Sequence, residues 1–155
     1  MYRPIKMTKM AKTESFLQTI HLILTGYAEG ALMSMEHLLA ALITVESSGN
    51  NEKACNGKLG CLQISPVVVE QVNRHYGTSF KETDALNRYK AKEIVEKYIR
   101  MTALPERIGR IPTDEDKARI WKGGLKGYKR QDTKPYWKKV NRELKKLKYI
   151  ALVGN

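Results

Sequence analysis

One acidic residue stands where an apolar segment meets a polar loop. Glu46 directly follows the apolar run 38–45, and the next four residues, Ser-Ser-Gly-Asn, are of types that end helices and open turns. Burial disfavours the charged form of a carboxyl group, so a glutamate in the last turn of a buried helix can keep its proton near neutral pH and serve as a general acid. The sequence therefore predicts that Glu46 faces a cleft beside the following loop. The simpler alternative is a surface glutamate at a helix end.

Three further segments follow the Glu46-Ser47 pair in a set order. They are Gly60-Cys61-Leu62-Gln63-Ile64, Ala118-Arg119-Ile120-Trp121-Lys122-Gly123-Gly124 and Tyr136-Trp137-Lys138-Lys139-Val140. Over about residues 35–145 the four segments resemble the SLT-type lytic transglycosylases and the related goose-type lysozymes of the lysozyme superfamily. The family segments they resemble are Glu-Ser, Gly-Leu-Met-Gln-Ile, Ala-Tyr-Asn-Ala-Gly and Tyr-Val-x-Lys-Val. Phage-borne cell-wall enzymes carry similar compact versions.

The resemblance implies both a fold and a reaction. The expected fold is mainly α, a lysozyme-like single domain with a substrate cleft and little or no β structure. The expected reaction cleaves the β-1,4 bond between N-acetylmuramic acid and N-acetylglucosamine in peptidoglycan and forms a 1,6-anhydro product. Glu46 is then the catalytic residue, and the substrate-binding residues are Ser47, Gln63, Trp121 and Tyr136.

The number of carboxylates bears on the type of reaction. A simple hydrolase needs a second carboxylate, about 5–5.5 Å from the acid as nucleophile or about 6.5–9.5 Å away as base. Glu52, Glu70 and Asp84 are candidates, but none lies in a motif that would place it opposite Glu46. In a lytic transglycosylase, as the resemblance implies, the muramic N-acetyl group stabilises C1, and one carboxylate is acid and base in turn. Two alternatives stay open: a peptidoglycan hydrolase (lysozyme or muramidase), and a non-catalytic glycan-binding protein of a virion or secretion machine.

Each expected binding residue also has a structural interpretation. Ser47 could equally cap the helix end, and the Gln63 amide could bond within the protein rather than to an N-acetyl or peptide group. Trp121 stands where the family usually has Tyr, and an indole can donate a hydrogen bond but cannot accept one. We therefore expect Trp121 to be a cleft wall as well as core, and Tyr136 to orient the acid. Lys122 stands where the family usually has Asn, which removes one contact.

The chain shows no pattern typical of a metal or cofactor site. His21, His37 and His75 share no metal-binding spacing, and two cysteines, Cys55 and Cys61, do not make a site by themselves. We predict no metal and no cofactor. We expect two reduced thiols, since a ring between them could close only outside the cytoplasm.

Apolar periodicity and capping residues predict the elements that position these residues. The expected helices run from Ser34 to Glu46, from Pro66 to His75, from Arg88 to Met101, from a Thr113/Asp116 capping box to Gly123-Gly124, and from Tyr136 to Leu147. Residues 49–60 are expected as a polar loop, 61–64 as a short extended piece, and 105–112 as a connector.

The chain divides into two expected parts. Residues 1–33, outside the resemblance, are expected to form a basic tail and an accessory helix over 13–24 that packs on the back of the transglycosylase domain, residues 34–155. The basic start and the apolar stretch after it superficially suit a secretory signal, but polar residues interrupt that stretch, so we do not expect a cleaved signal.

The charge of the chain indicates its partners. The 155 residues include 28 Lys and Arg and 16 Asp and Glu, a formal net charge of +12, which favours a polyanionic partner. We expect peptidoglycan glycan strands as substrate, and anionic wall polymers or lipid headgroups at the lysine-rich C-terminal helix. The scattered basic residues do not point to nucleic acid, and no apolar run is long enough to cross a membrane. We expect a monomer acting in the periplasm or cell wall, phage-encoded, virion-associated or exported.

Overall fold

The computed structural model describes residues 20–21 and 34–153. The chain forms two compact units, residues 1–35 and residues 36–155. Of the predicted accessory helix over 13–24, only Ile20 and His21 are described, and both are helical. The predicted packing of this helix lies outside the described residues.

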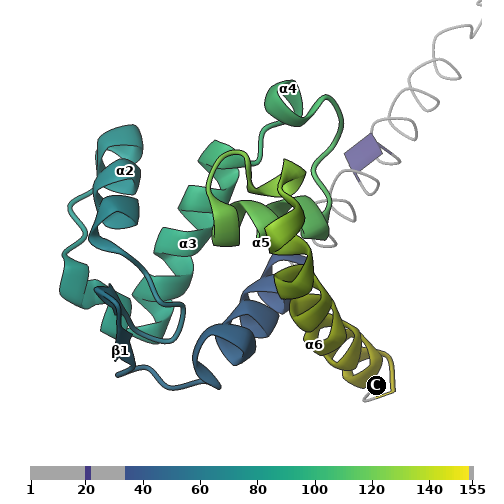
Figure 1. Ribbon diagram of the computed structural model, residues 1–155, viewed down its shortest axis with the longest axis horizontal. Helices are drawn as coiled ribbons and strands as arrows, with labels where there is room; N and C mark the ends of the chain where they lie inside the picture. The colour runs from purple at the N-terminus through teal and green to yellow at the C-terminus, as the bar shows by residue number, and fades with distance from the viewer. Residues whose placement is uncertain (1–19, 22–33, 154–155) are drawn as a thin grey trace, which may run out of the picture. The chain divides into compact units, whose positions relative to one another are not determined.

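The second unit is built mainly from helices, as the sequence predicts, with little β structure. Residues 34–47 are helical. The later elements are β1 (Ala54–Cys55), β2 (Lys58–Leu59), α2 (Pro66–Tyr76), η1 (Glu82–Leu86), α3 (Arg88–Thr102), α4 (Pro105–Ile108), α5 (Asp114–Gly123), η2 (Gly127–Lys129), η3 (Gln131–Thr133) and α6 (Lys134–Val153) (Figure 1). The three η elements are short 3-10 helices.

The helix of residues 34–47, blue in Figure 1, supplies the centre of the core. Leu38, Leu39 and Leu42 have no exposed surface, and burying one leucine side chain stabilises a fold by about 1.5–3 kcal/mol. The other helices contribute further fully buried side chains, among them Val72, Ile94, Val95, Ile120 and Val140. Because the buried helix stops one residue after Glu46, this side chain lies at the boundary between core and loop.

The polar loop after Glu46 contains a small β-hairpin, which differs from the predicted irregular loop. β1 pairs antiparallel with β2. Asn56 and Gly57 connect them with φ angles of 52° and 72°. Two successive left-handed residues give the tight turn that suits the right-handed twist of a hairpin, and Asn-Gly is its preferred sequence. The hairpin is therefore readable from this dipeptide.

The segment after the hairpin is a turn, so the predicted extended piece over 61–64 is wrong. The Gln63 N–H donates to the Gly60 carbonyl at 3.1 Å, and Gln63 has a φ of 52°. Gly60 has a φ of 78°, and a Cβ at this position would lie 1.7 Å from the carbonyl oxygen of Ala85. The close approach of the η1 backbone thus requires a glycine here and forces the chain to turn.

We expect Gly60→Ala to destabilise the protein more than Gly57→Ala does. Both glycines have left-handed φ angles, so both substitutions carry similar backbone strain, but a Cβ at Gly57 would meet nothing within 4 Å. The overlap at Gly60 should cost about 1–3 kcal/mol beyond the control, the range for overpacking. Urea unfolding of the two variants measures the difference. Equal destabilisation would mean that the η1 backbone moves aside without cost.

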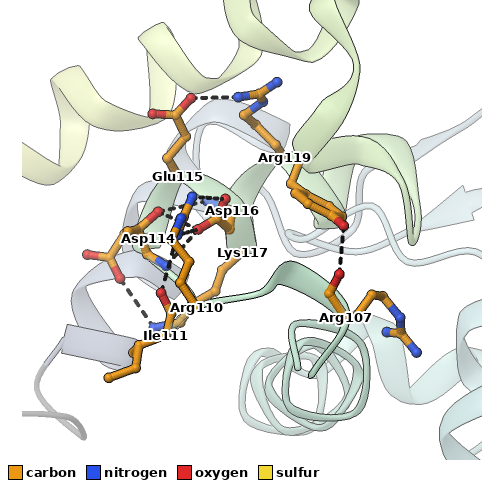
Figure 2. A network of polar contacts seen from close by, with 10 residues as sticks. Arg107, Arg110, Ile111, Asp114, Glu115, Asp116, Lys117 and Arg119 are labelled. Carbon is orange, nitrogen blue, oxygen red and sulfur yellow. Dashed lines mark hydrogen bonds and ion pairs between the residues drawn. The ribbon is translucent and has the colours of Figure 1, made fainter. Parts of the chain in front are cut away.

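The start of α5 confirms the predicted capping box. The Thr113 hydroxyl accepts from the Asp116 N–H at 3.3 Å, and the Asp116 carboxylate accepts from the Thr113 N–H at 2.8 Å. Arg110 donates to both oxygens of this carboxylate, at 2.5 and 3.0 Å (Figure 2). Burial by itself would raise the pKa of Asp116, but the hydrogen bonds from Arg110 and Thr113 outweigh it and hold this pKa below its usual value.

The lowered pKa of Asp116 makes the contribution of this cap depend on pH. The contribution is fully present above the unfolded-state pKa, near 4, and is lost as pH falls through the lower folded-state value. We expect Asp116→Asn to lower the free energy of unfolding by about 1 kcal/mol at neutral pH, the typical worth of a cap. The difference should shrink as the pH falls below about 4. Thermal melts over this range would test it, and a pH-independent difference would contradict an electrostatic role.

The last helix is longer than predicted at both ends. α6 runs from Lys134 to Val153, whereas the apolar face predicts only residues 136–147. That face is present, since Tyr136, Val140 and Leu144 are buried. No glycine or proline follows until after Val153, so nothing in the sequence ends the helix earlier. Neither α6 nor any other helix within residues 20–21 and 34–153 is long and apolar enough to span a bilayer.

Candidate active site

A small cavity of about 100 Å³ opens beside the end of the helix that carries Glu46. Its walls come from that helix, the β-hairpin, the turn before α2, the start of α2 and the end of α5. The lining residues are Glu46, Lys58, Gln63, Ser65, Val68, Trp121 and Lys122. The structure thus brings three of the predicted site residues to one cavity, between the loops after Glu46 and the helix that carries Trp121.

Tyr136 holds the carboxyl group of Glu46. Its hydroxyl donates to Glu46 Oε1 at 2.7 Å across 90 positions of sequence. Tyr136 is buried and Glu46 is half-buried. Burial raises the pKa of Tyr136 far above its usual value, and the nearby Glu46 charge and hydrogen bond add to this rise. The hydroxyl therefore stays protonated and is a permanent donor to the carboxyl group, which is the orienting role predicted for Tyr136.

Arg119 fixes the segment that leads into α6 and so positions Tyr136. The buried Arg119 guanidinium donates to Thr133 Oγ1 at 3.0 Å and to the Arg130 carbonyl at 2.8 Å. The Thr133 hydroxyl donates in turn to the Gly127 carbonyl at 2.8 Å. These bonds fasten residues 127–133 against α5, so that α6 begins where its third residue reaches Glu46.

Three lysines either line the cavity or contact the backbone of Glu46. Lys58 and Lys122 line the cavity, and Lys122 Nζ lies 5.1 Å from the centre of the Tyr136 ring. Lys53 Nζ donates to the backbone carbonyl of Glu46 at 2.5 Å. Lys53 and Lys58 are not among the residues predicted from the sequence, and no pattern there singles them out. Lys122 is signalled only as the departure from the family's Asn, and its position over the Tyr136 ring is a contact that the sequence does not indicate.

Ser47 has a structural role at the helix end. Its hydroxyl donates to the Ile43 carbonyl and accepts from the Gly49 N–H, both at 3.2 Å. These bonds satisfy backbone groups where the helix stops. Ser47 is buried and is not among the residues that line the cavity. The capping interpretation accounts for its position.

Gln63 combines a structural role with a place in the cavity wall. Its Nε2 donates to the carbonyls of Lys53 and Gly60, at 3.0 and 2.9 Å, and so closes the loop that carries the hairpin. Both amide hydrogens are used in this way, so Oε1 is the part of the side chain left to meet a ligand. Contact of Gln63 with a glycan stays a prediction.

Trp121 forms part of the cavity wall, but it is not among the buried side chains of the core. It is half-buried, lines the cavity, and packs edge to face on Tyr98 with ring centres 5.7 Å apart. On the Tyr98 side lies a larger open cleft of about 600 Å³. Its lining residues are Gln71, Arg74, His75, Tyr98, Met101, Thr102, Gly124 and Leu125.

The other candidate carboxylates are engaged elsewhere. Glu70 pairs with Arg74 at 2.5 Å. Asp84 accepts from Lys90 Nζ at 2.8 Å and from the Lys81 N–H at 2.9 Å. Glu52 is exposed in the loop before the hairpin. Of the described residues that line the cavity, Glu46 is the one acid.

The cysteines and histidines are not part of the cavity wall. Cys55 is exposed, Cys61 is buried, and both are free thiols. Burial raises the pKa of Cys61, which makes its thiol less reactive. Within the described ranges, no group of three or more His, Cys, Asp and Glu side chains is placed to hold a metal ion.

Comparison with known proteins does not assign the chain to a family. A scan against models of protein families finds none that matches the chain, and a search of curated proteins likewise finds no match. The interpretation of the cavity therefore depends on its own residues and their geometry.

Proposed function

We propose that residues 34–155 form a peptidoglycan lytic transglycosylase. The observation that carries this proposal is Glu46, the one acid among the described residues of the cavity wall, held by the hydroxyl of buried Tyr136. The order of the four sequence segments supports the same reaction class. The substrate would be the β-1,4 bond between N-acetylmuramic acid and N-acetylglucosamine.

The proposed reaction uses Glu46 twice. Protonated Glu46 first gives its proton to the glycosidic oxygen, and the bond from C1 to that oxygen breaks as the muramic sugar takes on oxocarbenium-like charge. The substrate's N-acetyl group stabilises C1. Ionised Glu46 then accepts the proton of the C6 hydroxyl, and the C6 oxygen bonds to C1 to close the 1,6-anhydro ring. Glu46 ends the cycle protonated, as it began.

The polar contacts of Glu46 suit this double role. Once Glu46 has given up its proton, the Tyr136 hydroxyl donates to an anionic oxygen, and hydrogen bonds to charged groups are the stronger kind. The contact between Lys53 and the Glu46 carbonyl holds the backbone at the same point. The carboxyl group can therefore lose and regain a proton without changing position.

Among the residues that the structure describes, the cavity wall holds no acid besides Glu46, and this favours the transglycosylase over the hydrolase. A hydrolase must place a second carboxylate within about 9.5 Å of the first, on the opposite side of the sugar. Glu70 and Asp84 are held by basic partners, and neither these residues nor Glu52 line the cavity. The intramolecular C6 hydroxyl makes such a residue unnecessary.

The cavity wall suits an acidic glycan. Lys58 and Lys122 offer two ammonium groups near the acid, and muropeptides carry carboxylates. The Trp121 ring offers a surface on which a sugar can stack. We therefore propose peptidoglycan strands as the partner, and the periplasm or cell wall as the place of action.

The products of digestion test the proposal. We expect the full chain to release soluble muropeptides from purified sacculi, and these should end in 1,6-anhydromuramic acid. Such ends lack a reducing sugar, so borohydride should leave their masses unchanged in mass spectrometry. Products that borohydride reduces would identify a hydrolase. Binding to sacculi without any release of products would identify a glycan-binding protein.

A further inference from the structure

The outward face of α6 changes character along its length. Its core side is marked by Tyr136, Val140 and Leu144. On the opposite side, the exposed residues of the first part of the helix are basic apart from Pro135, whereas the last described turns carry exposed apolar side chains. The basic residues are Lys134, Lys138, Lys139, Arg142, Lys145 and Lys146, and the apolar ones are Tyr149, Ile150, Leu152 and Val153.

The apolar end of α6, defined as Tyr149, Ile150, Leu152 and Val153, is well exposed. Each of these side chains is between 62% and 80% exposed. With 3.6 residues per turn, the four positions cover roughly half of the helix circumference, on the side opposite the buried face. Four large apolar side chains together in water mark a site of interaction rather than isolated surface residues.

The basic part of the face selects the partner. α6 holds seven basic residues and one acidic residue, Glu143, a net charge of +6. Glu143 pairs with Arg142 and Lys146. Among the described residues, no ion pair uses Lys138, Lys139 or Lys145, and all three are exposed. An apolar end beside several lysines is complementary to an anionic lipid surface, where headgroups meet the charges and acyl chains receive the apolar side chains.

We propose that the outward face of α6 binds an anionic phospholipid bilayer, with its apolar end inserted at the interface and its lysines over the headgroups. A soluble polyanion would use the lysines but would leave the apolar end in water. The aliphatic groups and Tyr149 together fit the boundary between acyl chains and headgroups, where aromatic side chains gather. The surface lies on the side of α6 away from Tyr136, and the proposal does not depend on glycan cleavage.

Co-sedimentation of the full chain with vesicles tests the proposal. We expect binding to vesicles of phosphatidylcholine with phosphatidylglycerol, weaker binding to phosphatidylcholine alone, and loss of binding as salt rises. Leu152→Ser should weaken binding to the anionic vesicles about tenfold, because an apolar side chain no longer leaves water. Lys145→Gln should weaken it about fivefold.

Matched controls distinguish binding through the proposed surface from nonspecific adsorption to vesicles. Ile111→Ser removes a side chain that is 83% exposed elsewhere, compared with 80% for Leu152. Lys126→Gln removes an exposed lysine outside α6. Both controls should bind vesicles like the unchanged chain.

Three results would overturn the proposal. The first is no binding to anionic vesicles. The second is vesicle binding that Lys145→Gln weakens and Leu152→Ser does not, since this would assign the face to polyanions in general. The third is a chain that sediments as a dimer and becomes a monomer on Leu152→Ser, which would assign the apolar end to a second copy.

Discussion

Glu46→Gln should lower the activity of the protein on sacculi by a factor on the order of 10² or more, the scale of general acid–base catalysis. Glutamine keeps the shape of the side chain, and its amide oxygen can still accept the hydrogen bond from Tyr136. It has no carboxyl proton to give to the glycosidic oxygen and cannot accept one from the C6 hydroxyl. The loss should therefore appear in turnover, while the melting temperature and the binding to sacculi stay nearly unchanged.

Glu52→Gln is the matched control for this result. Glu52 lies on the loop after the same helix, is exposed, and does not line the cavity. We expect the control to keep full activity in the assay of released muropeptides. Full activity in Glu46→Gln would remove the basis of the proposed function. Loss of activity in Glu52→Gln would instead point to a hydrolase with a second acid on this loop.

The helices could be predicted because their signals are local. The Thr113/Asp116 capping box and the proline and glycine that bound α2 each act within one helical turn, and each has the predicted position. Ser65 precedes α2 and has the extended backbone of an N-cap residue, but its side chain makes no capping hydrogen bond. The proline in the first turn and the apolar face are enough to start that helix.

The parts of the fold that the sequence predicts wrongly depend on signals that are not local. The turn over 61–64 depends on the approach of the Ala85 backbone to Gly60, a contact between segments 25 residues apart. An apolar stretch such as Cys-Leu-Gln-Ile favours an extended strand on local grounds. The apolar core face of α6 also does not show where the helix ends. Residues 149–153 are helical but exposed, so they do not continue the buried pattern.

The candidate site could be predicted in part. Glu46, Gln63 and Trp121 line one cavity, and Tyr136 reaches the acid, so the motif order does bring these residues together. A cap at the helix end is one of the two interpretations of Ser47 that the sequence allows, and bonds within the protein are one of the two for Gln63. The lysines could not be predicted, because whether Lys58 or Lys122 lines the cavity, and whether Lys53 reaches the Glu46 carbonyl, depends on the path of the hairpin and the end of α5.

Tyr136→Phe should lower turnover about 10- to 100-fold. The substitution removes one hydroxyl and keeps the ring that packs in the core and under Lys122. A hydrogen bond to a charged group contributes about 1.5–3 kcal/mol, and about 1.4 kcal/mol corresponds to a tenfold change in rate. Without the bond at 2.7 Å, Glu46 is free to rotate away from the glycosidic oxygen, and its ionised form loses a donor. The Lys122 ammonium lies over the ring face, 5.1 Å from its centre.

The effect of Tyr136→Phe should fall on the chemical step rather than on binding. Tyr136 is a positioning residue that acts through Glu46, so kcat on a soluble glycan fragment should fall while KM stays nearly constant. Tyr128→Phe is the control, because the Tyr128 hydroxyl also donates one hydrogen bond, to the Arg107 carbonyl at 2.9 Å, and does so outside the cavity. If the two variants lose activity equally, or if Tyr136→Phe raises KM alone, the hydroxyl does not orient the acid. If kcat falls only in Tyr136→Phe, at unchanged melting temperature, the hydrogen bond from Tyr136 positions Glu46 for the chemical step.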